Sequence, residues 1–135
     1  MNWLRFVDLG AYLVLAVVTA QHWQNDRHHW IGAAISLPAL VLWMLARYQL
    51  GSSFAVRAEA KKLVTHGIYS KIRNPIYLFG GLAFLGEFAA LRWYMWAAVL
   101  VIINLGQYFR IKREEQVLEA AFGDDYRAYK SKTWF

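Results

Sequence analysis

Residues 76–109 read IYLFGGLAFLGEFAALRWYMWAAVLVIINLGQYF, and Glu87 and Arg92 are the only charged residues in this run. A single helix over 34 residues would be about 51 Å long, whereas the hydrocarbon core of a bilayer is only about 30 Å thick. We therefore expect two membrane helices, over residues 76–91 and 93–109, joined by a turn near Arg92.

Two further apolar stretches, residues 3–20 and 30–46, lie before this run. Hydrophobic residues make up 59% of the 135-residue chain and charged residues only 18%, which is typical of a membrane protein. The first stretch is interrupted by Asp8, so we interpret it as a span rather than a cleaved leader. The prediction is an all-α fold: one domain over residues 1–135, with about four transmembrane helices and a C-terminal cytoplasmic amphipathic helix.

The basic residues indicate the orientation. Thirteen of the fifteen Lys and Arg residues fall in residues 47–75, in residues 110–135 or at Arg5. By the positive-inside rule, both termini and the 47–75 segment are cytoplasmic, in an inner or cell membrane. The net charge of +6 then reflects topology and contact with membrane lipids, and no nucleic-acid partner is predicted.

The pair Asn74-Pro75 marks the expected start of the third span. Pro is favoured at the first position of a helix, and Asn is a good N-cap residue. The positive end of such a helix suits a carboxylate or a phosphate group. The same pattern also fits a well-capped membrane helix with no ligand, and residue chemistry alone leaves both interpretations open.

The tail from Arg110 has the pattern of an amphipathic helix that ends at Gly123. Arg110 and Glu114 are four residues apart and are expected to form an ion pair. This pair is either an ordinary surface contact or part of a site at the membrane surface, opposite Asn74.

Other polar residues are weaker candidates. His22, Asp26, His28 and His29 lack a defined ligand spacing, so no metal site is predicted. The absence of cysteine excludes thiolate chemistry. Glu87 and Asn104 lie at membrane depth, where they either have a function or form hydrogen bonds across the helix hairpin.

Four motifs in the second half of the chain are similar to motifs of a known protein family. They are LVTHGIY at residues 63–69, RNPIY at 73–77, Glu114-Glu115, and FGDDYRAY at 122–129. In this order and spacing, the chain resembles the integral-membrane isoprenylcysteine carboxyl methyltransferase family, which is related in outline to membrane phospholipid methyltransferases. The resemblance covers roughly residues 61 to 130.

This resemblance implies S-adenosyl-L-methionine as cofactor and S-adenosyl-L-homocysteine as product, bound between the last two membrane helices and the tail. The methyl acceptor is expected to be lipophilic or lipid-anchored, with O-methylation of a carboxylate favoured over N-methylation, because Arg110 matches a position that orients the substrate. The cofactor-binding residues implied by similarity are Lys61, Lys62, Leu63, Val64, Tyr69, Asn74, Pro75, Tyr77 and Glu114.

Two other functions fit parts of the sequence. Four short spans with Glu87 at membrane depth are compatible with a small transporter or an assembly subunit. Some membrane NADPH-dependent reductases have similar cytoplasmic ends. The sequence does not indicate the oligomeric state.

Overall fold

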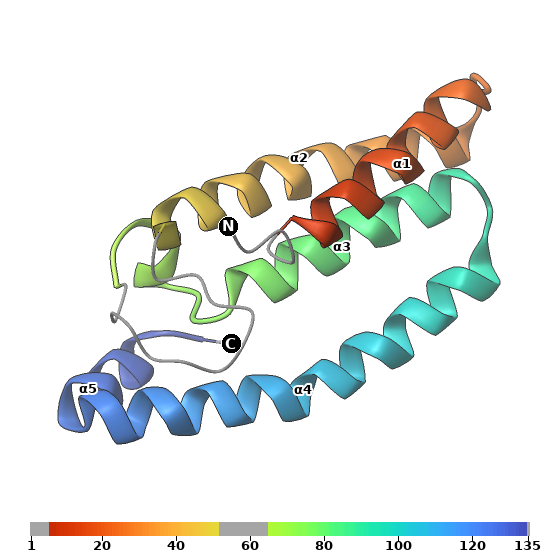
Figure 1. The fold of residues 1–135 in the computed structure, drawn as a ribbon. Helices are drawn as coiled ribbons and strands as arrows, with labels where there is room; N and C mark the ends of the chain where they lie inside the picture. The colour runs from red at the N-terminus through yellow and green to blue at the C-terminus, as the bar shows by residue number, and fades with distance from the viewer. Residues whose placement is uncertain (1–5, 52–64, 135) are drawn as a thin grey trace.

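We analysed a computed structural model of the protein, which describes residues 6–51 and 65–134. The described residues are almost entirely helical, and Ile72 and Trp134 form an isolated parallel bridge. The all-α class is therefore confirmed. The elements, shown in Figure 1, are α1 (Val7–Gln21), α2 (Arg27–Leu50), the short 3-10 helix η3 (Gly67–Ser70), α3 (Pro75–Ala90), α4 (Tyr94–Phe122) and α5 (Asp124–Lys132).

The predicted turn near Arg92 is present. Helix α3 ends at Ala90 and α4 begins at Tyr94, so three residues reverse the chain direction. Arg92 has a φ of 58°, in the left-handed region that a non-glycine residue rarely adopts. The turn therefore forms without the Gly or Pro that usually marks one, and it has little signature in the sequence.

Helix α4 is longer than the predicted fourth span. It continues without a break for 29 residues, about 44 Å, and ends where Gly123 adopts a φ of 55°. The predicted stop at Gly123 is therefore correct, but the amphipathic segment after Arg110 is the second half of α4 rather than a separate helix. The short α5 follows Gly123 and folds back (Figure 1).

Two helices, α2 and α4, are long and apolar enough to cross a membrane, while α1 and α3 are shorter apolar helices. The apolar half of α4 packs little against the rest of the protein. Met95, Ile102 and Phe109 are each more than two-thirds exposed.

Helices α2 and α3 lie against each other at very short range. A Cβ atom added to Gly32 would lie 2.5 Å from the carbonyl oxygen of Gly86, and one added to Gly86 would lie 2.7 Å from the backbone nitrogen of Ser36. Small residues therefore set this helix-to-helix distance. Beside the contact, Tyr12 of α1 packs with Ala39, Trp43 and Ala83 in a buried core.

Glu87 and Asn104, which the sequence predicts at membrane depth, both form hydrogen bonds to helix residues. Glu87 accepts hydrogen bonds through Oε1 from the Tyr12 hydroxyl at 3.1 Å and from the Ser36 hydroxyl at 2.8 Å. It thus joins α3 to α1 and α2, whereas the sequence had suggested a bond across the α3–α4 hairpin. Asn104 donates to the carbonyl of Leu100 in its own helix at 2.9 Å.

Candidate functional site

One end of the bundle brings together segments that are far apart in the sequence. The end of α2, η3, the start of α3, the end of α4 and α5 all lie there, opposite the α3–α4 turn (Figure 1). The backbone N–H of Ile68 donates to Gln49 Oε1 at 2.8 Å, which fastens η3 to α2. Tyr69 of η3 is buried in a small cluster with Ala46.

Three residues predicted for the site lie in contact at this end. The hydroxyl of Tyr77, in the first turn of α3, donates to Glu114 Oε1 at 2.8 Å. Arg110 Nε donates to the same oxygen at 3.1 Å, and the Arg110 guanidinium lies 5.9 Å from the centre of the Tyr77 ring. The predicted Arg110–Glu114 pair is confirmed, and it is part of a contact between α3 and α4.

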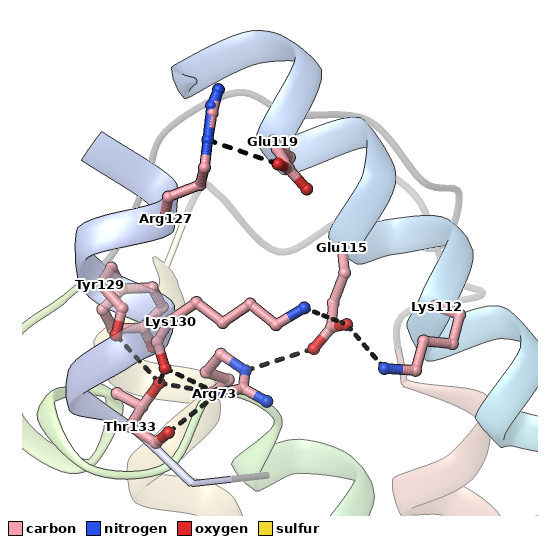
Figure 2. A network of polar contacts seen from close by, with 8 residues as sticks. All are labelled: Arg73, Lys112, Glu115, Glu119, Arg127, Tyr129, Lys130 and Thr133. Atoms are coloured by element: carbon pink, nitrogen blue, oxygen red, sulfur yellow. Dashed lines mark hydrogen bonds and ion pairs between the residues drawn. The ribbon is translucent and has the colours of Figure 1, made fainter. Parts of the chain in front are cut away.

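A second contact runs parallel to the first. Arg73 precedes α3 by two residues, and its Nε donates to Glu115 Oε1 at 3.2 Å. The other carboxylate oxygen of Glu115 pairs with Lys112 at 3.3 Å and with Lys130 at 3.5 Å, as Figure 2 shows. Two residues of the RNPIY motif, Arg73 and Tyr77, therefore contact the two adjacent glutamates of α4.

Glu115 is charged in this network. Burial alone would raise the pKa of its carboxyl group, but the hydrogen bond from Lys112 and the charges of Lys130, Lys112 and Arg73 outweigh burial and lower the pKa below its usual range. Its side chain is only 8% exposed. We call this cluster the Arg73–Glu115 joint, because the buried Glu115 carboxylate connects α4 to Arg73 before α3 and to Lys130 of α5. Removing the carboxylate would leave its three cationic partners without it.

The residues at the end of α5 and just after it form hydrogen bonds with the segment before α3. Arg73 Nη1 donates to the carbonyl oxygens of Lys130 at 3.1 Å and Thr133 at 2.9 Å (Figure 2). The backbone N–H of Trp134 donates to the carbonyl of Lys71 at 3.0 Å. Arg73 thus holds α5 and α4 against the start of α3.

Several buried polar atoms at this end have no hydrogen-bond partner among the described residues. They are the hydroxyls of Tyr69, Tyr126 and Tyr129 and the side-chain amide nitrogen of Asn74. Buried polar groups are nearly always hydrogen-bonded, so these atoms are candidates to contact a ligand or ordered water. Burial raises the pKa of both Tyr126 and Tyr129 to about 12, so both hydroxyls keep their protons and can donate.

Asn74 differs from the prediction in one respect. It occupies the N-cap position of α3, which begins at Pro75 as expected, but its side chain makes no capping hydrogen bond. The physical reason is its backbone, with a ψ of 54°. Asp26, which does cap α2, has the extended ψ of 170° that directs a side chain over the first turn. The Asn74 amide is therefore left for another partner.

The other predicted residues are placed as follows. Tyr69 and Pro75 are buried at the same end, in η3 and at the start of α3. Lys61, Lys62, Leu63 and Val64 lie outside the described residues, as do most of the residues between α2 and η3. The sequence reasoning did not assign roles to Arg73, Glu115, Tyr126 and Tyr129, although all four are letters of the quoted motifs.

The comparisons with known proteins agree with this arrangement. A family model described as phospholipid methyltransferase matches residues 27–125, from the start of α2 into α5. The chain therefore belongs to the phospholipid methyltransferase family. Together with the two long apolar helices, family membership indicates a membrane protein.

Two curated relatives are named protein-S-isoprenylcysteine O-methyltransferase, which confirms the resemblance to that group. The protein from Dictyostelium discoideum is 29% identical over 124 residues, covering 78% of this chain and 47% of the relative. The protein from Schizosaccharomyces pombe is 33% identical over 100 residues, covering 64% of this chain and 39% of the relative.

A third relative, an uncharacterised protein from Haemophilus influenzae, is 49% identical over 37 residues, covering 27% of this chain and 59% of the relative. The chain thus spans roughly half the length of the curated relatives it matches. No solved structure matches the chain significantly.

Proposed function

We propose that the protein is an S-adenosylmethionine-dependent methyltransferase that acts on a lipophilic or lipid-anchored acceptor at the cytoplasmic face of a membrane. One observation carries the proposal, namely the double contact between the RNPIY motif and the two glutamates of α4. Arg73 binds Glu115, and Tyr77 binds Glu114. Motifs about 40 residues apart in the sequence therefore form one wall beside the orphaned polar atoms.

The residues present fit the proposed cofactor. S-adenosylmethionine carries a carboxylate, an ammonium group, two ribose hydroxyls and an adenine ring, all of which need hydrogen-bond partners. The Asn74 amide nitrogen and the hydroxyls of Tyr69, Tyr126 and Tyr129 are buried and have no hydrogen-bond partner among the described residues. Glu114 offers a carboxylate to an ammonium or hydroxyl group, and the N-terminus of α3 suits a carboxylate.

Lys61, Lys62, Leu63 and Val64 belong to the proposed binding set by similarity. Pro75 starts α3, where the N–H group that it lacks would have no partner within the helix. Tyr77 offers an aromatic face, and its hydroxyl fixes the Glu114 carboxylate.

The chemistry asks little more of the protein than alignment. When bound, S-adenosylmethionine supplies a methyl group already activated on a positively charged sulfur. The tasks left to the protein are to hold the acceptor in line and to exclude water. Tyr126 and Tyr129 of α5 serve the second task, because both side chains are less than one-tenth exposed.

Arg110 is the residue we propose to orient the acceptor. Its side chain is 41% exposed, at the level where α4 leaves its apolar half, so a lipid-anchored group can reach it. A guanidinium binds a carboxylate well, and on this ground O-methylation is proposed ahead of N-methylation. The Tyr77 ring and Glu114 hold Arg110 in place.

The proposed setting is an inner or cell membrane crossed by α1, α2, α3 and α4. Both termini and the α2–α3 connection then lie in the cytoplasm, where the water-soluble cofactor is available. The exposed apolar half of α4 faces lipid. A lipophilic acceptor enters sideways from the bilayer.

A thermal-shift comparison tests the class of function. The purified protein is melted in detergent with S-adenosylhomocysteine, with NADPH, and with neither. We expect S-adenosylhomocysteine alone to raise the melting temperature, because only a ligand that binds the folded state stabilises it. A shift with NADPH instead would favour a membrane reductase. No shift with either compound would support the non-enzymatic transporter or assembly subunit.

A further inference from the structure

Helix α5 is a short element that is attached to the rest of the protein at its two ends. It covers Asp124–Lys132 and directly follows Gly123, where α4 stops. Beyond α5, the backbone N–H of Trp134 donates to the carbonyl of Lys71 at 3.0 Å, and Trp134 forms the isolated parallel bridge with Ile72. Figure 1 shows α5 folded back beside the end of α4.

The inner face of α5 carries two buried tyrosines. Tyr126 is 1% exposed and Tyr129 is 8% exposed, and their ring centroids lie 6.2 Å apart. Burial, and after it the nearby Tyr129, raise the pKa of Tyr69, so Tyr129 lies near the η3 helix. The hydroxyls of these three tyrosines have no hydrogen-bond partner in the described part of the chain. We call Tyr69, Tyr126 and Tyr129 the tyrosine cluster, and α5 covers one side of it.

Polar contacts fasten the far end of α5. Arg73 Nη1 donates to the carbonyl oxygens of Lys130 at 3.1 Å and Thr133 at 2.9 Å, and to the Thr133 hydroxyl at 3.1 Å (Figure 2). Lys130 also pairs with Glu115 at 3.5 Å. The Arg73–Glu115 joint therefore holds the last turn of α5 and the residues just after it.

Little apolar packing supports these contacts. Six of the nine residues of α5 are exposed, and only its two tyrosines are buried. Arg127 pairs with Glu119 at 3.5 Å, but both side chains are about half exposed, so the pair contributes little to stability. Elements with few buried contacts open at a lower free energy than the core of a protein.

Gly123 is the point about which α5 can turn. Its φ is 55°, a backbone conformation that favours glycine. A Cβ atom added there would meet no described atom within 4 Å. The backbone at Gly123 can therefore change its dihedral angles without displacing a neighbouring side chain.

We propose that α5 is a lid that turns about Gly123, releases its contacts with Arg73, and uncovers the tyrosine cluster so that a ligand can enter and leave. That this ligand is S-adenosylmethionine, with S-adenosylhomocysteine as product, rests on the proposed function. The closed lid excludes water during methyl transfer, and its opening limits the rate at which the product leaves.

A disulfide across the parallel bridge tests the lid. The chain has no cysteine, and neighbouring strands lie about 4.8 Å apart, which suits a disulfide between Ile72→Cys and Trp134→Cys. Trp134 is 60% exposed, so its replacement removes little packing. In the full chain in detergent, oxidation should slow the release of labelled S-adenosylhomocysteine at least about ten-fold, and a reductant should restore it. Unchanged release from the oxidised double variant would overturn the proposal.

A pair of glycine substitutions tests the hinge. Gly123→Ala strains the closed lid, because alanine disfavours a φ of 55°, and release of S-adenosylhomocysteine should become about five-fold faster. Gly106→Ala is the matched control, since its added Cβ also meets no described atom within 4 Å but its backbone is helical. Release from the control should not change. Equal release rates for the two variants would overturn Gly123 as the hinge.

Hydrogen exchange on the unmodified chain without ligand tests the opening itself, and it decides the matter if a variant does not fold or the disulfide does not form. The amides of residues 128–132 should exchange together, at least about ten-fold faster than those of residues 111–118 in α4. Exchange of α5 as slow as that of α4 would overturn the lid even if the cofactor binds. If the unmodified chain does not bind S-adenosylhomocysteine, the proposed function fails, and the exchange data alone decide whether α5 opens.

Discussion

The buried tyrosine hydroxyls without partners lead to an unusual expectation at the scale of single residues. Tyr69→Phe and Tyr129→Phe each remove a buried hydroxyl that has no hydrogen-bond partner in residues 6–51 and 65–134. The stability of the free protein should therefore stay the same or rise by up to about 1 kcal/mol, while affinity for S-adenosylhomocysteine should fall about five-fold. Thermal melting and titration calorimetry measure the two quantities.

The matched control for this pair is Tyr48→Phe. Tyr48 is 84% exposed, so its hydroxyl is hydrated and its removal should change neither stability nor affinity. If Tyr69→Phe and Tyr129→Phe both bind S-adenosylhomocysteine as the unmodified protein does, the orphaned hydroxyls do not face the cofactor.

Glu115 predicts a pH dependence. Because folding lowers the pKa of its carboxyl group below the usual 4.5, its contribution to stability is fully present above that value and is lost as the pH falls through the lower folded value. Glu115→Gln should cost about 2–4 kcal/mol near neutral pH, since it leaves three cations without their carboxylate. The melting temperature of the variant should then depend less on pH below 4.5 than that of the unmodified protein.

Glu119→Gln serves as the comparison for Glu115. Glu119 is about half exposed and pairs with Arg127 at 3.5 Å, so its loss should cost under about 1 kcal/mol and leave the acid dependence intact. Equal effects of the two substitutions would show that the Arg73–Glu115 joint does not hold α5 in place.

At the scale of the elements, the backbones of α2 and α3 approach each other closely at Gly32 and Gly86. Gly32→Ala would place a methyl group 2.5 Å from the Gly86 carbonyl oxygen, so the helices must separate, at a cost of about 1–3 kcal/mol. Gly10→Ala in α1 meets nothing within 4 Å and should be neutral or stabilising by up to about 1 kcal/mol. Melting both variants in detergent checks the prediction, and similar losses for both would contradict it.

The helices themselves could largely be predicted from the sequence, because long apolar runs between charged segments leave few alternatives. The start of α3 at Pro75 and the stop of α4 at Gly123 follow from local backbone preferences. The unbroken passage of α4 through Arg110 could not be predicted, because hydropathy changes there while helix propensity does not. The α3–α4 turn was predicted from bilayer thickness alone. Its residue with a positive φ is Arg92, and an arginine does not mark a turn in the sequence as a glycine does.

The site was predictable only in part. Tyr77, Glu114 and Arg110 came from the motif resemblance, and the structure brings them into contact. The roles of Arg73 and Glu115 could not be derived from the sequence. The two residues are 42 positions apart, and their contact depends on how α4 packs on α3. The orphaned atoms of Tyr126 and Tyr129 are likewise visible only once burial is known.

At the scale of the whole molecule, the proposed topology can be read by labelling. The chain has no cysteine, so a single introduced cysteine reports its own side of the membrane. With a membrane-impermeant maleimide added outside intact cells, Gln21→Cys should be labelled, and Tyr48→Cys and Ser131→Cys only after permeabilisation. All three positions are exposed in the folded protein. Labelling of Tyr48→Cys from outside would contradict a cytoplasmic cofactor site.

The central claim is methyl transfer at the membrane, and a radiolabel transfer assay tests it most directly. Purified protein in native lipid is incubated with S-adenosylmethionine labelled in the methyl group, and the lipid is then extracted. We predict label in the lipid extract with the unmodified protein and little with Glu114→Ala. Alkaline treatment should release the label as methanol if a carboxylate is methylated, and should not release it if an amine is. An extract without label from a folded protein that binds S-adenosylhomocysteine, across carboxylate-bearing and amine-bearing lipids, would contradict the account.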